Sequence, residues 1–496
     1  MTIRLFNTLT NSIEELQPSD GEALRIYACG PTVYDYGHIG NFRTFLHVDV
    51  LRRTLELQGM KVRHVMNITD VDDKIIRNAA AAYVPISEYT PRFEKAFFED
   101  LDALSVEHPE VVARATEHIP EMVALIKRLA EQDIAYKVED GSWYFRIAKF
   151  PEYGKLSKKD FSGIADGARV DVDEYDKDSA RDFALWKAPK PGEYRWETDL
   201  GPGRPGWHIE CSAMAMEYLG ESFDLHAGGE DLMFPHHENE IAQSESATHT
   251  AFARHWFHVR FLLVEGRKMS KSEGNFYTLR DLLLKGYKAS AIRFLLTSVP
   301  YRQQLNFTFE GLAAETGAVE RLRTFYQRLK TTPWPENNSS QGGTTIREAA
   351  CAAKEKFRAA LANDLNTAEA RAAIFDLVRF VNAAADAGSL SESDLPNILD
   401  VLADFEKIFA VLEDNDARWT RFALEWAERE GRLDEASPEV RAQLSLTDGQ
   451  IDALIEERNK ARRARNFARA DAIRKDLLEK GIILEDSKEG VRWKRK

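Results

Sequence analysis

The first hundred residues alternate short apolar segments with helical patterns, and this alternation restricts the fold more than any other feature of the chain. Residues 24–29 form an apolar run of strand length, which a glycine–proline turn at 30–31 follows. The pattern predicts a helix over residues 41–58, a second strand over 61–67 and a further helix beginning near Asp70. Strand, helix and strand in this order favour a parallel sheet with helices on both faces. We therefore predict an α/β fold built on a Rossmann-like parallel sheet.

The rest of the chain differs in texture from this first region. A chain of 496 residues is too long for one ordinary domain. From about residue 116 a helix, a hairpin-like pair of strands and a polar stretch interrupt the parallel-sheet rhythm, and apolar periodicity resumes near Trp207. Helical patterns then dominate from residue 278 to about 429. We expect a Rossmann-like domain over 1–115 and 206–277, an insertion over 116–205, a region over 278–310 that follows the sheet, a helical bundle over 311–440 and a small basic α+β domain over 441–496.

Several local patterns add to this outline. Residues 256–264 are predicted to form one more buried strand. Thr278 and Asp281 have the spacing of a capping box at the start of a helix. The stretch 332–345 has the composition of a loop, and a helix over 448–480 contains a break before a terminal hairpin.

Charge is distributed unevenly along the chain. The formal net charge is −14, which by itself argues against binding to nucleic acid. From Asp452 to the C-terminus, however, 14 basic and 9 acidic side chains give a net charge of +5. Such an asymmetry indicates either a separate nucleic-acid contact surface or a solvated helix face.

The cysteines and the N-terminus indicate where the protein works. Cys29, Cys211 and Cys351 are the three cysteines, too few and too scattered for a disulfide framework. Residues 1–16 lack the layout of a signal peptide, and no apolar run reaches the ~18 residues that span a bilayer. We expect a cytoplasmic protein without a membrane segment, whose cysteines bind metal or take part in catalysis.

The segment Cys-Gly-Pro-Thr-Val-Tyr-Asp-Tyr-Gly-His-Ile-Gly-Asn, residues 29–41, lies between the first strand and the first helix. A glycine-rich turn there lets backbone N–H groups and the helix N-terminus approach phosphate. His38 could donate a hydrogen bond to a phosphoryl oxygen, and Gly30 and Gly40 leave room for close approach. A tight structural turn is the alternative interpretation.

A second segment, Lys268-Met-Ser-Lys271-Ser272, lies between the strand that ends near Val264 and the helix that Thr278 caps. Two ammonium groups in a loop suit the pyrophosphate that leaves when the α-phosphorus of a nucleotide is attacked. A solvated basic turn is the alternative for this segment alone. Two such loops in one predicted domain favour phosphate chemistry.

Four potential metal ligands lie in three separated segments. His236 and Glu240 are four residues apart and share one side of a helix, and Cys29 and Cys211 could complete the set. Zinc accepts this combination of sulfur, nitrogen and carboxylate oxygen. The alternatives are a buried apolar role for Cys211 and a structural helix turn for His236. Scattered ligands at a sheet edge favour a catalytic or substrate-binding zinc site over a structural finger.

Together these segments resemble a known family. The two loops resemble the ATP-binding motifs of class I aminoacyl-tRNA synthetases. Taken with NITDVDDKI at 67–75, GWHIECSAM at 206–214 and FPHHENE at 234–240, they resemble the cysteinyl-tRNA synthetase family. The similarity runs in order from about Arg4 to Tyr301 and more loosely to the C-terminus. It implies that cysteine is activated with ATP to cysteinyl-adenylate and transferred to the 3′ end of tRNA(Cys).

The resemblance also implies roles for individual residues and parts. Cys29, Cys211, His236 and Glu240 match the ligands of one zinc ion, which would select the substrate thiol without an editing domain. The cysteine pocket is matched by Thr69, Trp207 and His226, and the adenosine side by Gly228, Gly229 and Asp231. His38, Asn41, Lys268 and Lys271 match groups that act on the ATP phosphates, with Mg²⁺ bound to ATP; Asn41 stands where a histidine is usual in class I enzymes. Residues 278–310 would then be a stem-contact region, residues 311–440 an anticodon-binding-type bundle and residues 441–496 a tRNA-contacting tail. We expect the protein to be a monomer.

Two other functions fit parts of the sequence. A ligase of the kind used in mycothiol biosynthesis joins cysteine to a small amine, but 198 residues follow Ser298 here and favour tRNA. A non-catalytic paralogue is disfavoured because both loops keep their charges and glycines. Trp493 beside Arg492 and Lys494 could stack on an unpaired base or could cover a small hairpin core.

Overall fold

The structure is a computed structural model that describes residues 1–159, 169–170, 182–190, 192–336, 345–442, 448–464, 466–480, 482–487 and 490–495. The chain forms two compact units, each assembled from three segments. Unit 1 comprises Met1–Met269, Leu296–Phe307 and Leu329–Phe409, and unit 2 comprises Ser270–Leu295, Thr308–Arg328 and Ala410–Lys496.

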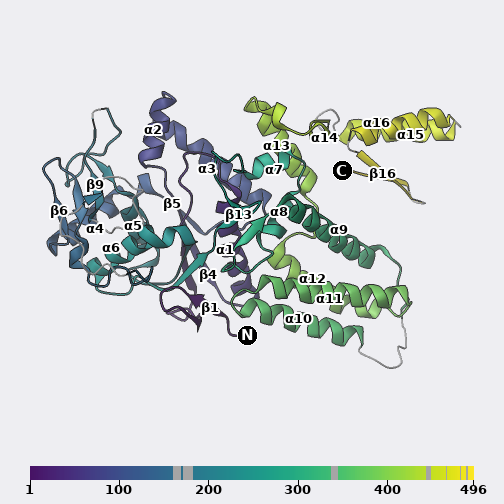
Figure 1. Cartoon of the computed structure of the whole chain (residues 1–496). Coiled ribbons are helices and arrows are strands. Elements are labelled where there is room, and N and C mark those ends of the chain that lie inside the picture. The colour runs from purple at the N-terminus through teal and green to yellow at the C-terminus, as the bar shows by residue number, and fades with distance from the viewer. Residues whose placement is uncertain are drawn as a thin grey trace. The chain divides into compact units, whose positions relative to one another are not determined.

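A five-stranded parallel sheet forms the centre of unit 1 (Figure 1). Its strand order is β12-β11-β3-β4-β5, with bounds Ala253–Val259, Phe223–Gly229, Leu24–Ala28, Val62–Ile68 and Val111–Arg114. Because β4 lies on one side of β3 and β11 on the other, the strand order reverses at β3. Ligands of such sheets bind at the carboxyl ends of the strands, at the point of reversal. The predicted α/β fold is confirmed.

Helices connect the parallel strands as the sequence predicts. α1 (Ile39–Leu57) joins β3 to β4 and is buried almost all round, while α2 (Asp73–Ala81) and α3 (Ile86–Ala103) join β4 to β5. α1 begins where His38 caps it, and α2 begins where the side chain of Asp72 accepts from the backbone of Ile75. Side-chain caps therefore set both helix starts just after a strand end.

A second, mainly antiparallel sheet lies between β5 and α5 (Trp207–Leu219) in the sequence. Its order is β10-β9-β7-β6, with β8 paired to β9. The bounds are Arg204–Pro205, Asp182–Lys187, Trp143–Phe145, Ala135–Lys137 and Arg169–Val170, and α4 (Ile119–Glu131) precedes them. The predicted helix and hairpin pair are confirmed, whereas much of the polar stretch after them lies outside the described residues.

The single strand predicted over residues 256–264 is wrong. The structure has two strands there, β12 and β13 (Leu262–Val264), which belong to different sheets. Arg260 and Phe261 between them are exposed, so the chain leaves the central sheet and joins β14 (Arg267–Lys268) and β15 (Leu305–Phe307). The N-terminal hairpin of β1 (Arg4–Asn7) and β2 (Ser12–Glu15) was not predicted, because strands of four residues are too short to give a clear periodic signal.

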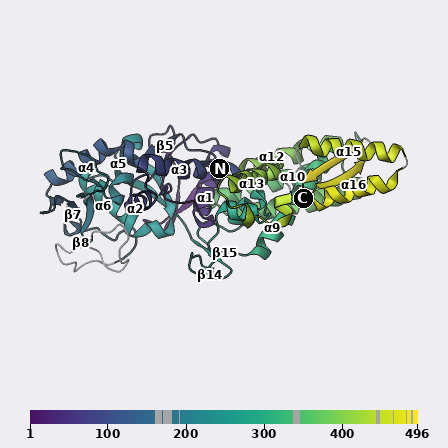
Figure 2. The ribbon, with the colours of Figure 1, turned by 90° about the horizontal axis from the view of Figure 1, so that it is seen from above.

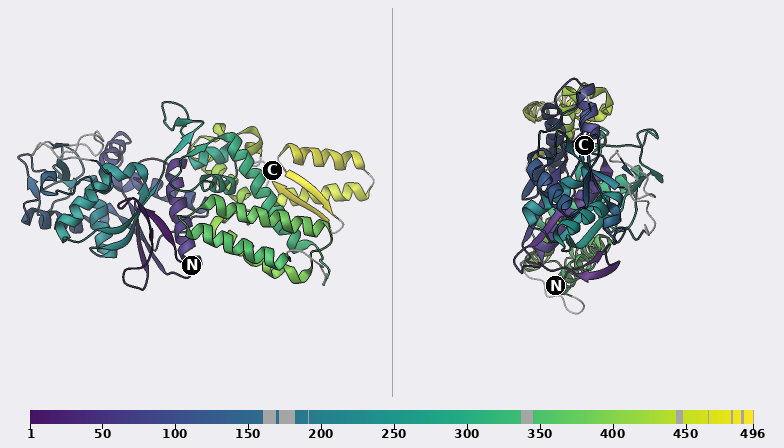
Figure 3. Two further views of the ribbon diagram at one scale, coloured as in Figure 1. Left: turned by 60° about the horizontal axis from the view of Figure 1, so that its bottom comes forward. Right: turned by 90° about the vertical axis from the view of Figure 1, so that its left-hand side faces the viewer.

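The last segment of unit 1 contains three long helices: α10 (Ile346–Ala362), α11 (Thr367–Asp386) and α12 (Leu395–Phe409). They lie side by side in Figures 1 and 3 and pack through buried faces that include Phe357, Phe405 and Phe409.

Unit 2 is mainly helical. Its helices are α7 (Leu279–Leu284), α8 (Ala289–Leu296), α9 (Phe309–Thr331), α13 (Asp416–Arg429), α14 (Pro438–Arg441), α15 (Asp448–Arg463) and α16 (Phe467–Glu479), with α8 and α9 extending into unit 1 segments. The capping box of Thr278 and Asp281 at the start of α7 is confirmed. The predicted break in the last helix is also confirmed, and it separates the adjacent α15 and α16 (Figure 2). The terminal hairpin is confirmed as well and is formed by β16 (Ile482–Ser487) and β17 (Gly490–Arg495).

Helices of the described parts of the chain are all too short or too polar to span a bilayer.

Buried histidines of unit 1 make its stability depend on pH. Burial lowers the pKa of His64 in β4 to about 3, well below the value of about 6.5 in an unfolded chain. Between these two pKa values the unfolded chain binds a proton at His64 that the folded protein does not. The unfolding free energy therefore has its full value above pH 6.5 and decreases as the pH falls toward 3. We expect His64→Leu to reduce the pH dependence of the unfolding free energy by about 1.4 kcal/mol per pH unit in that window. Urea unfolding at pH 7, 6 and 5 checks this; equal slopes in both proteins would contradict it.

Candidate active site and metal cluster

Several predicted site residues follow the carboxyl ends of neighbouring strands. Cys29 comes directly after β3, Thr69 directly after β4, and Gly228 and Gly229 end β11. The backbone of Thr69 donates to the Pro31 carbonyl at 3.1 Å, and Val33 donates to the Thr69 carbonyl at 3.1 Å. The first loop is therefore tied to the neighbouring strand end.

Gly30 makes the closest approach within this loop. Its N–H donates to Asn67 Oδ1 at 2.8 Å, and a Cβ placed on Gly30 would lie 1.7 Å from the Asn67 carbonyl oxygen. Only glycine fits here, because a fixed backbone atom occupies the space that any side chain would need.

We expect Gly30→Ala to lower the unfolding free energy by about 1–3 kcal/mol and to slow by about 10²-fold the adenylate formation that the family resemblance implies. Backbone would have to move, and the loop would move with it. Thermal melting and ATP–pyrophosphate exchange measure the two effects. Gly449→Ala is the matched control, since its Cβ meets nothing within 4 Å. Wild-type exchange by the Gly30 variant would contradict the prediction.

His38 and Asn41 cap α1 reciprocally. The backbone N–H of Asn41 donates to His38 Nδ1 at 3.1 Å, and the backbone N–H of His38 donates to Asn41 Oδ1 at 3.1 Å. Since Nδ1 accepts a hydrogen bond, the neutral imidazole carries its proton on Nε2. The backbone N–H of Asn41 thus fixes the orientation and tautomer of the His38 ring, while its side-chain oxygen holds the His38 backbone N–H.

The second loop follows β14. Lys268 is exposed in that strand, and Met269 lies against Gly40, where a Cβ would meet the Met269 methyl at 3.2 Å. Lys271 is exposed, with its Nζ 5.0 Å from the ring centre of Phe276. The backbone N–H of Ser270 donates to the buried Asn275 side chain at 2.8 Å, so the loop is held by its own residues.

The four predicted metal ligands are brought together. One donor atom from each of Cys29, Cys211, His236 and Glu240 lies within 4.8 Å of the others, and all four side chains are buried. His236 Nε2 is 3.1 Å from Glu240 Oε1, and the Cys29 thiol donates to that oxygen at 3.8 Å. Cys29 directly follows β3, and Cys211 lies in α5 (Trp207–Leu219). His236 lies in the short helical segment Met233–His237, and Glu240 lies in α6 (Glu238–Thr248), which follows it.

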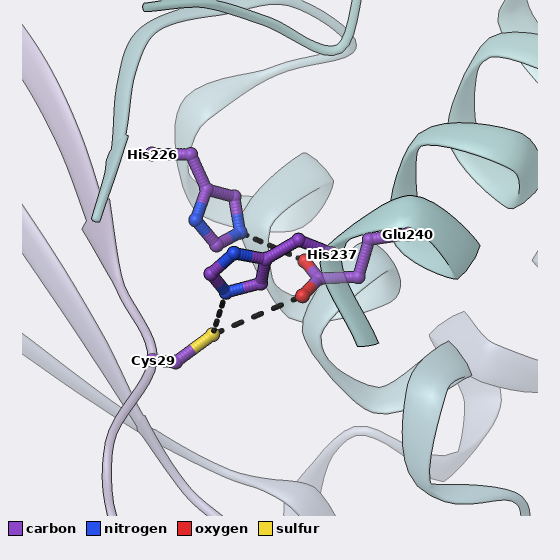
Figure 4. Close-up of side chains that lie close together, drawn as sticks. All are labelled: Cys29, His226, His237 and Glu240. Carbon is purple, nitrogen blue, oxygen red and sulfur yellow. Dashed lines mark hydrogen bonds and ion pairs between the residues drawn. The ribbon is translucent and has the colours of Figure 1, made fainter. Parts of the chain in front are cut away.

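A second group shares two of these ligands. Cys29, His226, His237 and Glu240 also have donor atoms within 4.8 Å of one another (Figure 4). Cys29 Sγ lies 3.3 Å from His237 Nε2, and His226 Nε2 lies 2.8 Å from Glu240 Oε2. In Figure 4 these side chains point toward one another from the end of β3, from β11 and from the start of α6. Two overlapping quartets therefore exist in one buried cluster.

Burial governs the pKa values in the cluster. It raises the pKa of Cys29 well above its usual value, and Cys211 adds to the shift. Burial opposes ionisation of Cys211 too, but hydrogen bonding with Cys29 and the proximity of His236 lower the pKa of that thiol to about 6. Burial also lowers the pKa of His237 and raises that of Glu210. Neutral rings and an easily ionised thiol are the states in which these groups bind metal.

The predicted substrate-pocket residues border this cluster. The indole of Trp207 stacks on His236 with ring centres 4.3 Å apart, and His226 stacks on Trp256 at 4.5 Å. The Thr69 hydroxyl accepts from Asn67 Nδ2 at 3.2 Å and donates to Glu210 Oε2 at 3.1 Å.

The residues predicted for the adenosine side lie at and just after the end of β11. Gly228 and Gly229 are buried at the end of β11, while Asp231 is exposed in the short helix Glu230–Leu232. A Cβ on Gly229 would lie 2.4 Å from Asp231 Oδ1, so the two residues are in direct contact.

Sequence reasoning gave no role to several residues of the cluster. His208 Nδ1 lies 2.9 Å from His236 Nδ1, and His237 Nδ1 lies 2.8 Å from His258 Nε2. His208, His237 and Glu210 stand inside quoted motifs, but only the fold shows what they contact. His258 lies in β12, where no motif in the sequence marked it.

Of the two roles considered for Trp493, the structure favours the one in which it covers a small hairpin core. Its ring packs on a small core that includes Ile451, Leu477 and Leu484, and its Nε1 donates to Asp452 Oδ1 at 2.8 Å. Phe467, at the start of α16, is instead 60% exposed.

Three family models match the chain. Residues 15–316 match "tRNA synthetases class I (C) catalytic domain", residues 356–413 match "DALR domain", and residues 446–493 match "Cysteinyl-tRNA ligase anticodon binding domain".

Whole-chain comparisons agree with these matches. The chain is 61% identical to a cysteine–tRNA ligase of Koribacter versatilis and 53% identical to one of Solibacter usitatus, covering 100% of both chains in each case. Among solved structures it is similar to a methionyl-tRNA synthetase of Mycobacterium tuberculosis, with a TM-score of 0.57, 16% identity and coverage of 86% of this chain and 95% of that one. A leucyl-tRNA synthetase of Agrobacterium radiobacter gives a TM-score of 0.55 at 12% identity, with 81% and 86% covered. The structural neighbours are informative about the fold alone.

Proposed function

Because the chain belongs to the cysteine–tRNA ligase family of class I synthetases, which joins cysteine to tRNA with ATP, we propose that its buried cluster holds one zinc ion that selects the substrate by its thiol. The single observation that carries the proposal is the convergence of Cys29, Cys211, His236 and Glu240 at the carboxyl edge of the central sheet.

The donor set suits zinc. Two thiols, one imidazole and one carboxylate are ligands that zinc accepts, and sulfur donors disfavour magnesium and calcium. We prefer this quartet to the one with His226 and His237 because it contains two sulfur ligands. Zinc bound there would supply a position that binds a thiolate far better than a hydroxyl. Discrimination of about 10⁴–10⁵ against serine is then within reach of a single site.

The two loops are proposed to act on ATP. His38 would donate from Nε2 to a phosphoryl oxygen while Asn41 holds its ring, and Lys268 and Lys271 would neutralise the leaving pyrophosphate. Gly30, Gly40, Gly228 and Gly229 would leave room for the nucleotide, with Asp231 on its adenosine side, and Mg²⁺ would accompany the phosphates. Thr69, Trp207 and His226 would line the cysteine pocket beside the metal.

The decisive experiment measures cysteine-dependent ATP–pyrophosphate exchange together with zinc content and transfer to tRNA. We expect one zinc per chain. Removing zinc should abolish the exchange, and returning zinc should restore it. Serine should support exchange at least about 10⁴-fold less well than cysteine. Full exchange by the zinc-free protein would overturn the metal proposal. Exchange without transfer to tRNA would favour the small-amine ligase, which the match to an anticodon binding domain disfavours.

The C-terminal region is proposed to contact the anticodon. Arg462, Arg463 and Phe467 are exposed around the turn between α15 and α16, where an aromatic ring and cations can hold an unpaired base.

We expect Phe467→Ala to weaken aminoacylation by about 5- to 100-fold through the KM for tRNA, as loss of one stacked base does, and to leave pyrophosphate exchange unchanged. Steady-state aminoacylation with varied tRNA measures the effect. Leu478→Ala, which alters another exposed apolar residue of α16, is the control. An unchanged KM for tRNA would remove Phe467 from the contact surface.

The remaining features follow from the same proposal. We propose that 1–115 with 206–277 is the catalytic domain, 116–205 a connective insertion, 278–310 a stem-contact region, 311–440 an anticodon-binding-type bundle and 441–496 the basic tRNA-contacting tail. We also propose a monomer that works in the cytoplasm, as the unpaired cysteines suggest.

A further inference from the structure

Glu210 is a buried carboxylate for which the proposed chemistry has no use. It lies in the first turns of α5, one residue before Cys211, and is 1% exposed. Its hydrogen bond is with the hydroxyl of Thr69, which donates to Glu210 Oε2 at 3.1 Å. Burying a carboxyl group away from water is costly unless it is hydrogen-bonded, so the position of Glu210 needs a reason.

The bond from Thr69 fixes how that hydroxyl can be used. A threonine hydroxyl has one hydrogen and two lone pairs. The hydrogen is directed to Glu210, and one lone pair accepts from Asn67 Nδ2 at 3.2 Å. One lone pair is left, so Thr69 can meet a further group only as an acceptor. Asn67 is itself held, because its Oδ1 accepts from the Gly30 N–H at 2.8 Å.

A hydroxyl that can only accept suits one part of an amino-acid substrate. The α-ammonium group carries three donors and a positive charge, whereas the carboxylate and thiolate carry acceptors and negative charge. Thr69 follows the end of β4 as Cys29 follows the end of the neighbouring β3, so both lie at the same carboxyl edge of the sheet as the cluster that would hold the thiol. Resting on the proposed function, we infer that Glu210 is a positioning residue that orients the Thr69 hydroxyl toward the α-ammonium group of the substrate cysteine.

The substitution Glu210→Gln tests this with little change of shape. A glutamine amide can donate to Thr69 and let the hydroxyl hydrogen turn outward, where it would face the ammonium donors. We expect the Kd for cysteine, measured by calorimetry on the zinc-loaded protein, to rise about 10- to 100-fold. The Kd for 3-mercaptopropionate, which has the thiol and carboxylate but no ammonium group, should stay within twofold. Zinc content should equal that of the wild type.

Two controls separate positioning from general damage. Glu217→Gln alters an exposed glutamate of the same helix and should change neither Kd. Thr69→Val should weaken cysteine binding as Glu210→Gln does, and adding Glu210→Gln to it should cost little more, because both act through one hydroxyl. Equal weakening of cysteine and 3-mercaptopropionate, or no weakening of either, would overturn the inference. So would full additivity of the two substitutions.

The same titrations report on the zinc proposal separately. Selection of the thiol is measured by the ratio of serine to cysteine affinity, since both amino acids carry the ammonium group. A ratio near one in the wild type would count against zinc selection, while the 3-mercaptopropionate comparison would still decide the role of Glu210.

Discussion

Replacing Cys211 by alanine is expected to abolish zinc binding and to reduce cysteine activation by about 10³-fold or more while the protein stays folded. The substitution removes one of two sulfur ligands from a buried quartet, and the remaining thiol, imidazole and carboxylate form a weaker site. A site that relies on one specific polar partner loses discrimination on this scale when the partner is removed. Metal analysis, circular dichroism and ATP–pyrophosphate exchange measure the three parts of the prediction.

The chain offers matched controls for this experiment. Cys351→Ala removes an exposed cysteine of α10, and it should leave zinc and activity unchanged. His237→Ala separates the two overlapping quartets, because His237 belongs only to the second. If zinc occupies the quartet with Cys211, the His237 variant should keep most of its metal. Stoichiometric zinc and wild-type exchange in the Cys211 variant would show that the ion is held elsewhere or not at all.

The sequence predicted the parts of the site that are local in the chain. The strand ends before Gly30 and Thr69 follow from apolar runs, and the loop between a strand and a helix needs only neighbouring residues to be recognised. His236 and Glu240 could be paired because helical spacing puts residues four apart on one side.

Contacts between distant segments could not be read in the same way. Thr69 and Glu210 are 141 residues apart, and only the packing of α5 beside the sheet brings them within hydrogen-bond distance. The same holds for His237 and Cys29, whose proximity creates the second quartet. The division of residues 256–264 into two strands depended on where Arg260 and Phe261 meet solvent, which an apolar run alone does not specify.

Asn41 shows how local geometry can explain a departure from a family pattern. Its backbone N–H donates to the His38 ring and its side-chain oxygen accepts from the His38 backbone N–H, so the amide side chain contributes by completing the helix cap. A histidine at position 41 would have to accept a hydrogen bond from the backbone N–H of His38 to complete the cap in the same way. The sequence alone placed Asn41 among the phosphate-binding groups, whereas the geometry favours a supporting role for it.

Lys271→Ala is expected to slow adenylate formation by about 10²–10³-fold with little change in the affinity for cysteine. The Lys271 ammonium is exposed on its loop, near the ring of Phe276, and makes its proposed contact with the pyrophosphate only as charge develops there. An interaction confined to the transition state lowers kcat and leaves ground-state binding of the other substrate intact.

Rapid-quench measurement of adenylate at saturating ATP, with cysteine varied, separates the two quantities. Lys285→Ala is the matched control, because Lys285 is an exposed lysine at the far end of α7, fourteen positions along the chain. Lys271→Arg should recover part of the rate, since it restores the charge with a different shape. A raised KM for cysteine at unchanged kcat would instead place Lys271 in the amino-acid pocket, and an unchanged rate would remove it from phosphate chemistry. Because Lys271 is proposed to contribute charge and Cys211 a metal ligand, the two variants should fail at different steps, one in reaction rate and the other in substrate binding.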